Sequence, residues 1–261
     1  MRVTELQVAV LVCAVAAGCS ETGAPPDAGA MQNRLASSCI GQVVNNTVWI
    51  YGPGGSAVDR PLPADARFEM GKISRRGDMI LGWNIGGLFA LDVGSGQISR
   101  LVRIQLTSSD FDLSADGSKI VWTGRDIVSG KRGLLRLDTQ SDQVEVIASS
   151  GAHPSMSPDG SSVAFEDGPL IKIHTNHAIR NDLTSPGSFP SWANDGLRVA
   201  YWTSKSSYRI LDISTAESRE MLANGEVVGP LQWSGDGTLV IYVTRTWRDY
   251  WAPYRVRSDI G

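Results

Sequence analysis

The feature that most constrains the fold is an internal repeat whose five copies align on one turn glycine. These glycines stand 40, 43, 36 and 41 residues apart, at Gly77, Gly117, Gly160, Gly196 and Gly237. Asp precedes four of them, and Asp-Gly is typical of a tight hairpin in which the glycine takes a positive φ angle. An apolar residue stands four places before every glycine, and a β-branched residue stands three places after it. The repeat therefore predicts a strand on each side of every turn.

Each repeat holds two further strands. The stretch Val163-Ala164-Phe165 is continuously apolar, as expected for a strand covered on both faces. A second template follows each hairpin, in which an apolar strand ends in Leu-Asp before a turn and another strand; it appears at residues 88–92, 134–138 and 208–212 and is degenerate at 170–174. Four strands in a unit of about 40–45 residues predict an all-β fold, a β-propeller of four-stranded antiparallel blades.

The two ends of the repeat region complement each other. Residues 48–51 and 57–58 resemble the outer strands of a blade without its inner pair, whereas 234–243 supplies an inner hairpin and 254–256 a third strand. An open propeller exposes sheet edges, so we expect the N- and C-terminal strands to share one closing blade. This arrangement predicts five blades.

The segment from Ser157 to Phe165 closely resembles the repeat of TolB-type propellers, which the propeller domains of prolyl-oligopeptidase-like peptidases share. The resemblance covers nearly all of residues 68–244. It implies a non-catalytic role by protein contact in the cell envelope, and six blades, the number usual in that family, is the alternative to five. The chain departs from TolB because the segment before the propeller is too short for an additional α/β domain. It also has no Gly-x-Ser-x-Gly elbow, so peptidase activity is not expected.

The N-terminus predicts export and lipid attachment. Residues 6–17 form a short apolar run behind Arg2, which is typical of a signal peptide. The run Ala16-Ala17-Gly18-Cys19 resembles the lipobox of bacterial lipoproteins, which implies acylation of Cys19. We expect a signal peptide at 1–18, a flexible tether at 19–39 and a propeller domain at 40–261. Ser20 after the cysteine favours the outer membrane by the same resemblance, with the chain facing the periplasm.

Composition excludes other classes of function. The formal net charge of −3 and the isoelectric point of about 5.6 give no electrostatic footprint for nucleic acid. Cys39 has no partner once Cys13 is cleaved off and Cys19 is acylated, so no disulfide is expected. The Asp-Gly aspartates are interpreted as turn formers, and neither a metal site nor a cofactor is predicted from His153, His174 and His177.

Two hairpin loops are candidates for a binding surface. Both are expected between the second and third strands of a blade, at residues 123–132 and 244–251, on the face opposite the Asp-Gly turns. Surface aromatics beside arginine are the residue types that dominate binding hot spots. The predicted binding residues are Arg125, Lys131, Trp247, Arg248 and Tyr250.

Two functions remain open at this point. The first is a monomeric, lipid-anchored propeller that binds a protein or an envelope polymer and has no catalytic residue. The alternative is a carbohydrate-active enzyme, a glycosidase or lyase, with paired carboxylates at the propeller channel. The expected inner strands offer Glu69 and Asp112 for that chemistry, and a pair of acids at the channel mouth would favour the enzyme.

Overall fold

A computed structural model describes the chain in segments, and its strands fall into two compact units, residues 1–102 and 103–261. The described residues are 9–11, 40–44, 47–51, 57–61, 70–74, 79–84, 87–92, 94–101, 104–175, 178–180, 183–204, 206–222, 226–227, 231–233, 240–242, 244–245 and 255–257.

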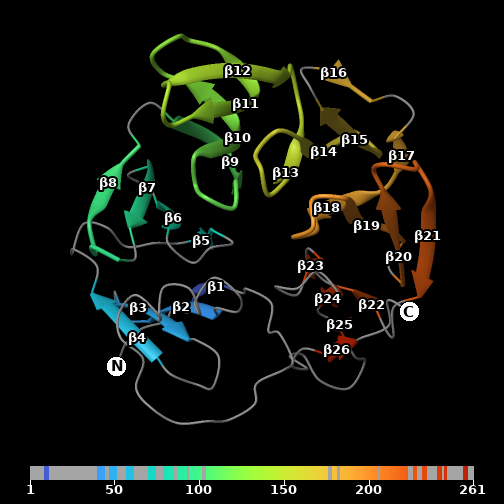
Figure 1. Ribbon diagram of the computed structural model, residues 1–261, viewed down its shortest axis with the longest axis horizontal. Coiled ribbons are helices and arrows are strands. Elements are labelled where there is room, and N and C mark those ends of the chain that lie inside the picture. The colour runs from blue at the N-terminus through green and yellow to red at the C-terminus, as the bar shows by residue number, and fades with distance from the viewer. Residues whose placement is uncertain are drawn as a thin grey trace, which may run out of the picture. The chain divides into compact units, whose positions relative to one another are not determined.

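The described residues of the first unit form two four-stranded antiparallel sheets. In both sheets the strands pair in chain order, so that each strand neighbours the next along the sequence (Figure 1). The first sheet consists of β1 (Ala9–Leu11), β2 (Ile40–Val44), β3 (Thr47–Tyr51) and β4 (Ala57–Pro61). The second consists of β5 (Met70–Ile73), β6 (Met79–Asn84), β7 (Gly87–Asp92) and β8 (Ile98–Arg100).

The second unit repeats the same antiparallel plan. Its first sheet contains β9 (Ile104–Leu113), β10 (Lys119–Asp126), β11 (Arg132–Asp138) and β12 (Gln143–Ala148). The next contains β13 (Ala152–Met156), β14 (Val163–Asp167) and β15 (Leu170–Thr175), whose outer edge pairs with the short strands β16 (Ala178–Ile179) and β17 (Ser185–Pro186). The third contains β18 (Ser188–Trp192), β19 (Arg198–Ser204), β20 (Ser207–Asp212) and β21 (Ser218–Leu222).

The last part of this unit is described as shorter strands. They are β22 (Glu226–Val227), β23 (Gln232–Trp233), β24 (Val240–Tyr242), β25 (Thr244–Arg245) and β26 (Arg255–Arg257). β24 pairs with both β23 and β26, which confirms the expected third strand near residues 254–256, and β22 pairs with β25. Together, the four-stranded antiparallel sheets confirm the predicted blades.

The Asp-Gly turns form as predicted wherever the structure describes them. Gly117, Gly160 and Gly196 have φ angles of 69°, 70° and 76°, which is the left-handed region that glycine adopts without a steric cost. Asp116 Oδ1 accepts hydrogen bonds from the N–H of Ser118 (3.0 Å) and the hydroxyl of Ser114 (2.7 Å). The aspartate therefore shapes the turn. Gly77 and Gly237 lie outside the described residues.

The Leu-Asp template marks the turn before each outer strand. Asp92, Asp138 and Asp212 each accept hydrogen bonds from backbone N–H groups two or three residues further on, at 2.7 to 3.1 Å. Such side-chain to backbone bonds are the reason that Asp is common in turns. Both recurring aspartates of the repeat thus have local roles in the turns.

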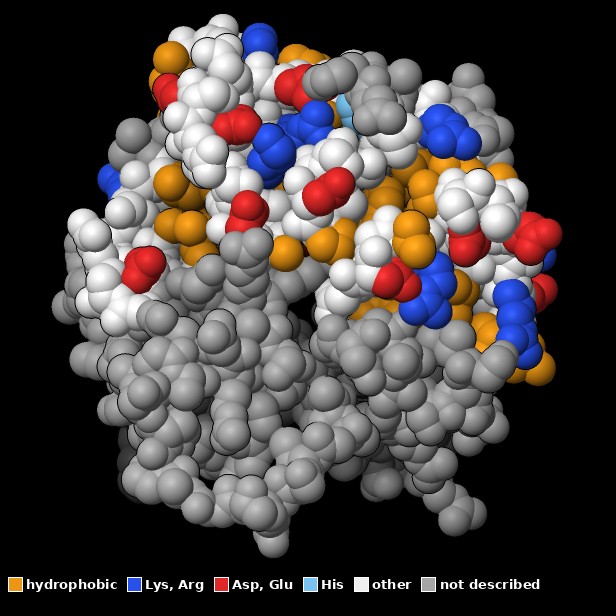
Figure 2. Space-filling model, in the orientation of Figure 1, with side chains coloured by type: hydrophobic (Ala, Val, Ile, Leu, Met, Phe, Trp, Pro, Cys, Tyr) orange, Lys and Arg blue, Asp and Glu red, His pale blue; other side chains and the backbone are white. Residues whose placement is uncertain are grey.

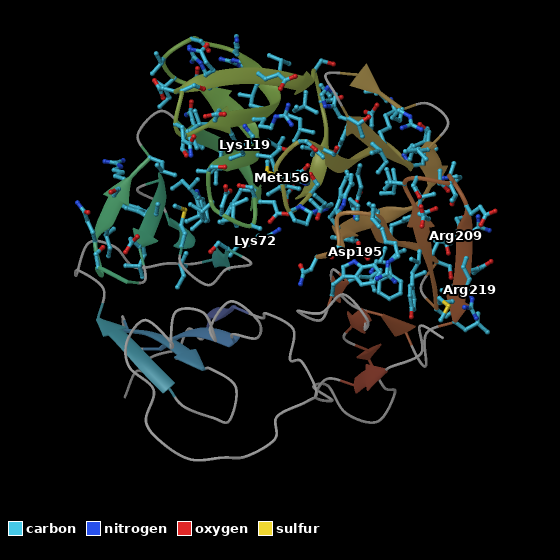
Figure 3. All side chains as sticks on the ribbon, in the orientation of Figure 1. Lys72, Lys119, Met156, Asp195, Arg209 and Arg219 are labelled. Atoms are coloured by element: carbon cyan, nitrogen blue, oxygen red, sulfur yellow. The ribbon has the colours of Figure 1, made fainter. Side chains whose placement is uncertain are left out.

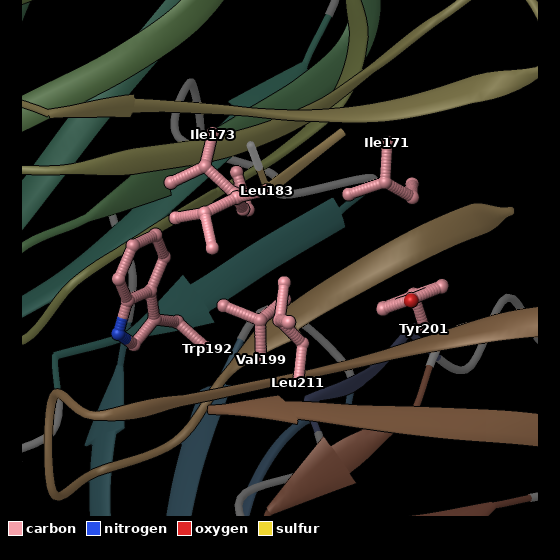
Figure 4. Close-up of a cluster of buried hydrophobic side chains, with 8 residues drawn as sticks. Ile171, Ile173, Leu183, Trp192, Val199, Tyr201 and Leu211 are labelled. Atoms are coloured by element: carbon pink, nitrogen blue, oxygen red, sulfur yellow. The ribbon is translucent and has the colours of Figure 1, made fainter. Parts of the chain in front are cut away.

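Adjacent blades of the second unit pack face to face through apolar side chains. Val163, Ala164 and Phe165 are completely buried, which confirms that this strand is covered on both faces. One cluster joins β14 and β15 to the next sheet, and its side chains converge from both sides (Figure 4). Its members are Ala164, Ile171, Ile173, Leu183, Trp192, Val199, Tyr201 and Leu211. Burial of this kind stabilises the fold by about 25 cal/mol for each Å² of apolar surface removed from water.

The expected closing blade is corrected by the strand pairings. β3 pairs with β2 on one edge and with β4 on the other, so neither edge is open to the C-terminal hairpin. β2 was not predicted from the sequence and β1 was assigned to the signal peptide, which left β3 and β4 without partners. Cleavage before Cys19 would remove β1 from the mature chain. The number of blades stays a prediction.

The repeated aspartates predict a pH dependence of stability. Burial of the Asp116 carboxyl opposes ionisation, but hydrogen bonds from Ser114 and Ser118 outweigh it and lower the pKa from 3.8 to about 2. A lowered folded-state pKa adds stability above the unfolded value, and that stability is lost as pH falls from 3.8 towards 2. Asp116→Asn should therefore cost less than about 1 kcal/mol near neutral pH, because the group is exposed and screened. Urea unfolding of wild type and Asp116→Asn at several pH values measures the difference in their free energies of unfolding. A difference that grows as the pH falls would contradict the prediction.

Candidate functional site

The first strands of two consecutive blades begin with matching distortions. His153 in β13 and Phe189 in β18 have φ angles of 46° and 50°, which L-residues rarely adopt. Each stands seven places before the turn glycine of its blade, and the pairing with the second strand shifts register beside it. These β-bulges redirect side chains at the start of the strand. Strain of this kind in equivalent positions is a reason to search for function there.

Asp110, at the same position in β9, joins these two residues in one row, which we name the first-strand row. His153 Nδ1 lies 3.2 Å from Asp110 Oδ1, and the His153 N–H lies 3.4 Å from Asp110 Oδ2. The His153 and Phe189 rings are in contact, with centroids 4.2 Å apart. The row therefore links three successive blades by an ion-pair geometry and an aromatic contact.

Polar groups near the row connect each blade to the backbone of the next. Asp112 Oδ2 accepts a hydrogen bond from the N–H of Met156 (2.8 Å), and Ser155 Oγ accepts one from Trp192 N–H (2.9 Å). The carboxylate of Glu166 accepts the N–H of Phe189. Unpaired backbone N–H groups are costly when buried, so these contacts contribute to the blade interfaces. Asp112, which the sequence suggests as a catalytic acid of the alternative function, thus has a contact that holds strands together.

Arg125 and Lys131 lie on the hairpin that joins β10 to β11. Arg125 is directly opposite Arg132 in the strand pairing. Lys131 is exposed, and its Nζ donates a hydrogen bond to the Val144 carbonyl oxygen (2.6 Å). The hairpin lies at the same end of its sheet as the start of β9, since Arg125 is also paired with Gln105. The structure thereby places two predicted binding residues at the end of the blade where the first strands begin.

The other predicted site residues lie outside the described part of the chain. They are Cys19, Trp247, Arg248 and Tyr250, together with Glu69 of the enzyme alternative. Conversely, the first-strand row was not predicted from the sequence. Extending the alignment to seven places before the turn glycine would have placed Asp110, His153 and Phe189 in one column.

The described residues contain no group of three or more His, Cys, Asp or Glu side chains that could hold a metal ion. Within the same residues, no helix is long and apolar enough to cross a membrane.

Charged side chains of both signs are interspersed on the described face in Figure 2. In Figure 3, Asp195 belongs to the inner turn of its sheet, while Arg209 and Arg219 lie on the outer strands.

The architecture defines the class of protein as a β-propeller, and solved structures agree. An oligogalacturonate lyase in complex with manganese is similar with a TM-score of 0.58 and 17% identity, covering 82% of this chain and 69% of that chain. TolB from Acinetobacter baumannii is similar with a TM-score of 0.57 and 18% identity, covering 77% and 54%. A chain of a mitotic checkpoint complex is similar with a TM-score of 0.55 and 13% identity, covering 80% of this chain and 68% of that chain.

At these identities the similarity shows the fold alone. The chain spans about half the length of the TolB structure. No family model and no curated protein matches the sequence. The propeller resemblance inferred from the repeat is confirmed, while the particular function has to be argued from the site.

Proposed function

We propose that the chain is a non-catalytic, lipid-anchored propeller that binds a protein or another envelope component. The binding face is the end of the blades where the first strands begin and where the hairpins between second and third strands lie. One observation carries the proposal: Asp110, Asp112 and Glu166 each accept a hydrogen bond from a backbone N–H of the following blade. These carboxylates act as structural connections rather than as an acid and base pair.

The same face offers groups suited to recognition. His153 is partly exposed and contacts Phe189, and the β10–β11 hairpin adds Arg125 and Arg132. Aromatic side chains and arginine dominate binding energies because they bury a large area at modest entropic cost. The predicted loop at 244–251 adds Trp247, Arg248 and Tyr250 from the sequence.

The binding proposal predicts the effect of removing two aromatic side chains. Trp247→Ala combined with Tyr250→Ala should weaken capture of the partner by at least about 2 kcal/mol, the scale of a hot spot, and leave folding nearly intact. Capture from solubilised envelope, quantified by titration, measures the loss. Leu197→Ser is the matched control, because Leu197 is exposed in an Asp-Gly turn at the opposite end of its blade. Equal capture by wild type and double variant, with both folded, would reject this face.

The anchoring part of the proposal predicts a change of cell fraction. Cys19→Ser removes the sulfur that would be acylated, so the protein should leave the detergent-soluble membrane fraction or remain unprocessed. Two acyl chains hold a protein stably at a bilayer, whereas a single chain binds only marginally. Fractionation with mass measurement of the mature N-terminus checks the result. Unchanged membrane association of the Cys19→Ser protein, with the signal cleaved, would contradict lipid attachment.

A carbohydrate-active enzyme is the second candidate. The contact between Asp110 and His153, two residues along β9 from Asp112, is the observation that favours it. Oligogalacturonate is a reasonable probe because one structure of the same fold is an oligogalacturonate lyase in complex with manganese. We expect no unsaturated product by ultraviolet absorbance, with or without Mn²⁺. Turnover that is lost on Asp112→Asn would support the enzyme instead.

A further inference from the structure

The hairpin between β10 and β11 differs from the other hairpins at the same end of the described blades. The β14–β15 turn is Gly168-Pro169, and β20 begins only three positions after the last residue of β19. The β10–β11 tip instead presents Ile127 and Val128, which are 53% and 73% exposed. Among the described residues, the other exposed large hydrophobic side chains are not adjacent to one another; they are Val146, Leu197 and Leu222.

A buried carboxylate fixes the conformation of this tip. Asp126 is fully buried and accepts hydrogen bonds from the N–H groups of Ser129 (3.0 Å) and Val128 (3.4 Å) and from the Ser129 hydroxyl. Its own N–H donates to the Lys131 carbonyl oxygen (2.9 Å). The two apolar side chains are thus held outward by a defined turn. A preorganised tip loses little conformational entropy on binding.

Two arginines at the base of the tip have no oppositely charged partner among the described residues. Arg125 and Arg132 are directly opposite in the antiparallel pair, and like charges in that position are destabilising. Within the described residues, neither side chain forms an ion pair. An anion that contacts both guanidinium groups would reduce this repulsion. Guanidinium groups bind phosphate through parallel hydrogen bonds.

We propose that this tip binds the surface of a bilayer that contains anionic phospholipids. Ile127 and Val128 enter the boundary of the acyl chains, while Arg125 and Arg132 contact lipid phosphates. Basic side chains beside an apolar tip are the combination that interfacial segments use. Protein hot spots are enriched in Trp and Tyr, whereas the described tip offers two aliphatic side chains, so the lipid surface fits better.

The inference rests on the proposed lipid anchor and adds an orienting contact to it. The predicted tether at 19–39, treated as a flexible coil of about 5–6 Å multiplied by the square root of its length, reaches roughly 25 Å. An anchored chain therefore meets the membrane at an effective concentration near the millimolar range. A weak contact at the tip is then sufficient to orient the propeller on the bilayer.

Vesicle sedimentation tests the proposal in the predicted mature chain, residues 19–261 with Cys19→Ser, so that neither the apolar signal peptide nor an acyl chain contributes to binding. Vesicles of one-third phosphatidylglycerol and two-thirds phosphatidylethanolamine should bind this protein, and added salt should weaken the binding. Ile127→Ser with Val128→Ser should lower the partition coefficient by about tenfold, since each buried aliphatic side chain contributes to transfer. Arg132→Gln should lower it on these vesicles and have little effect on vesicles of phosphatidylcholine alone.

Leu197→Ser is the matched control, because it removes an aliphatic side chain that is as exposed as Ile127 from the opposite end of a blade. It should bind like the parent, and melting curves should show that all variants fold. Equal partition of parent and tip variants, or no preference for anionic vesicles, would overturn the proposal. If the tip variants lose capture of an envelope protein but still bind vesicles like the parent, the tip contacts a protein partner, and this result would also overturn the proposal. Each of these results leaves the Cys19 fractionation test unaffected.

Discussion

Gly124→Ala should lower the free energy of unfolding by about 3 kcal/mol or more, through steric overlap and backbone strain together. Gly124 has a φ angle of 159° and lies in β10 opposite Gly133. A Cβ atom at this position would lie 2.0 Å from the carbonyl oxygen of Gln105 and 3.0 Å from the Cα of Leu106. Both atoms belong to the backbone of β9, so no side-chain rotation can relieve the overlap. Chemical unfolding monitored by tryptophan fluorescence measures the effect.

Two further glycines provide the comparison. Gly133→Ala should be similarly damaging, because its Cβ would lie 2.3 Å from the Ala148 carbonyl oxygen. Gly168 has a φ angle of 62°, and no atom lies within 4 Å of the position that an alanine Cβ would take there. Gly168→Ala should therefore cost only about 1 kcal/mol, from strain. Losses of similar size at Gly124 and Gly168 would show that φ, and not the close approach of β9, sets the cost.

Replacement of Arg136 should give the second large loss of stability, of about 2–4 kcal/mol for Arg136→Met. Arg136 lies in β11 and is 8% exposed. Its Nη1 donates to the carbonyl oxygens of Gly160 (2.9 Å) and Ser161 (2.7 Å) in the Asp-Gly turn of the next blade. Its Nη2 pairs with the carboxylate of Glu145. One guanidinium thus connects two blades, and methionine fills the volume without supplying a donor.

Arg136→Lys should restore little of this stability, because one ammonium group cannot reproduce the two guanidinium edges. The control is Arg209→Met on β20. Arg209 has a side-chain exposure of 39%, its contact with Glu220 spans 3.7 Å, and such surface pairs contribute about 0–1 kcal/mol. Thermal and urea unfolding of the three variants provide the comparison. Equal losses for Arg136→Met and Arg209→Met would contradict a role of Arg136 between blades.

The sequence alone determined the features that depend on neighbouring residues. The turn glycines, the aspartates before them and the Leu-Asp template were predicted because each hairpin satisfies its hydrogen bonds within a few residues. Asp116 and Ser114 show this directly, since their contacts all lie inside one turn. The continuous burial of Val163, Ala164 and Phe165 was predictable for a similar reason, because a run of apolar residues in a strand requires cover on both faces.

The tertiary structure alone decided which residues meet between blades. Asp110 and His153 are 43 positions apart, and only the stacking of consecutive sheets brings their side chains together. The same stacking lets Asp112 accept a hydrogen bond from the Met156 N–H and lets Arg136 donate to the Gly160 carbonyl oxygen in the turn of the next blade. The pairing of β3 with β2 also replaced the expected closing blade. A repeat fixes what each blade contains, whereas contacts between blades depend on packing and register, which no local pattern encodes.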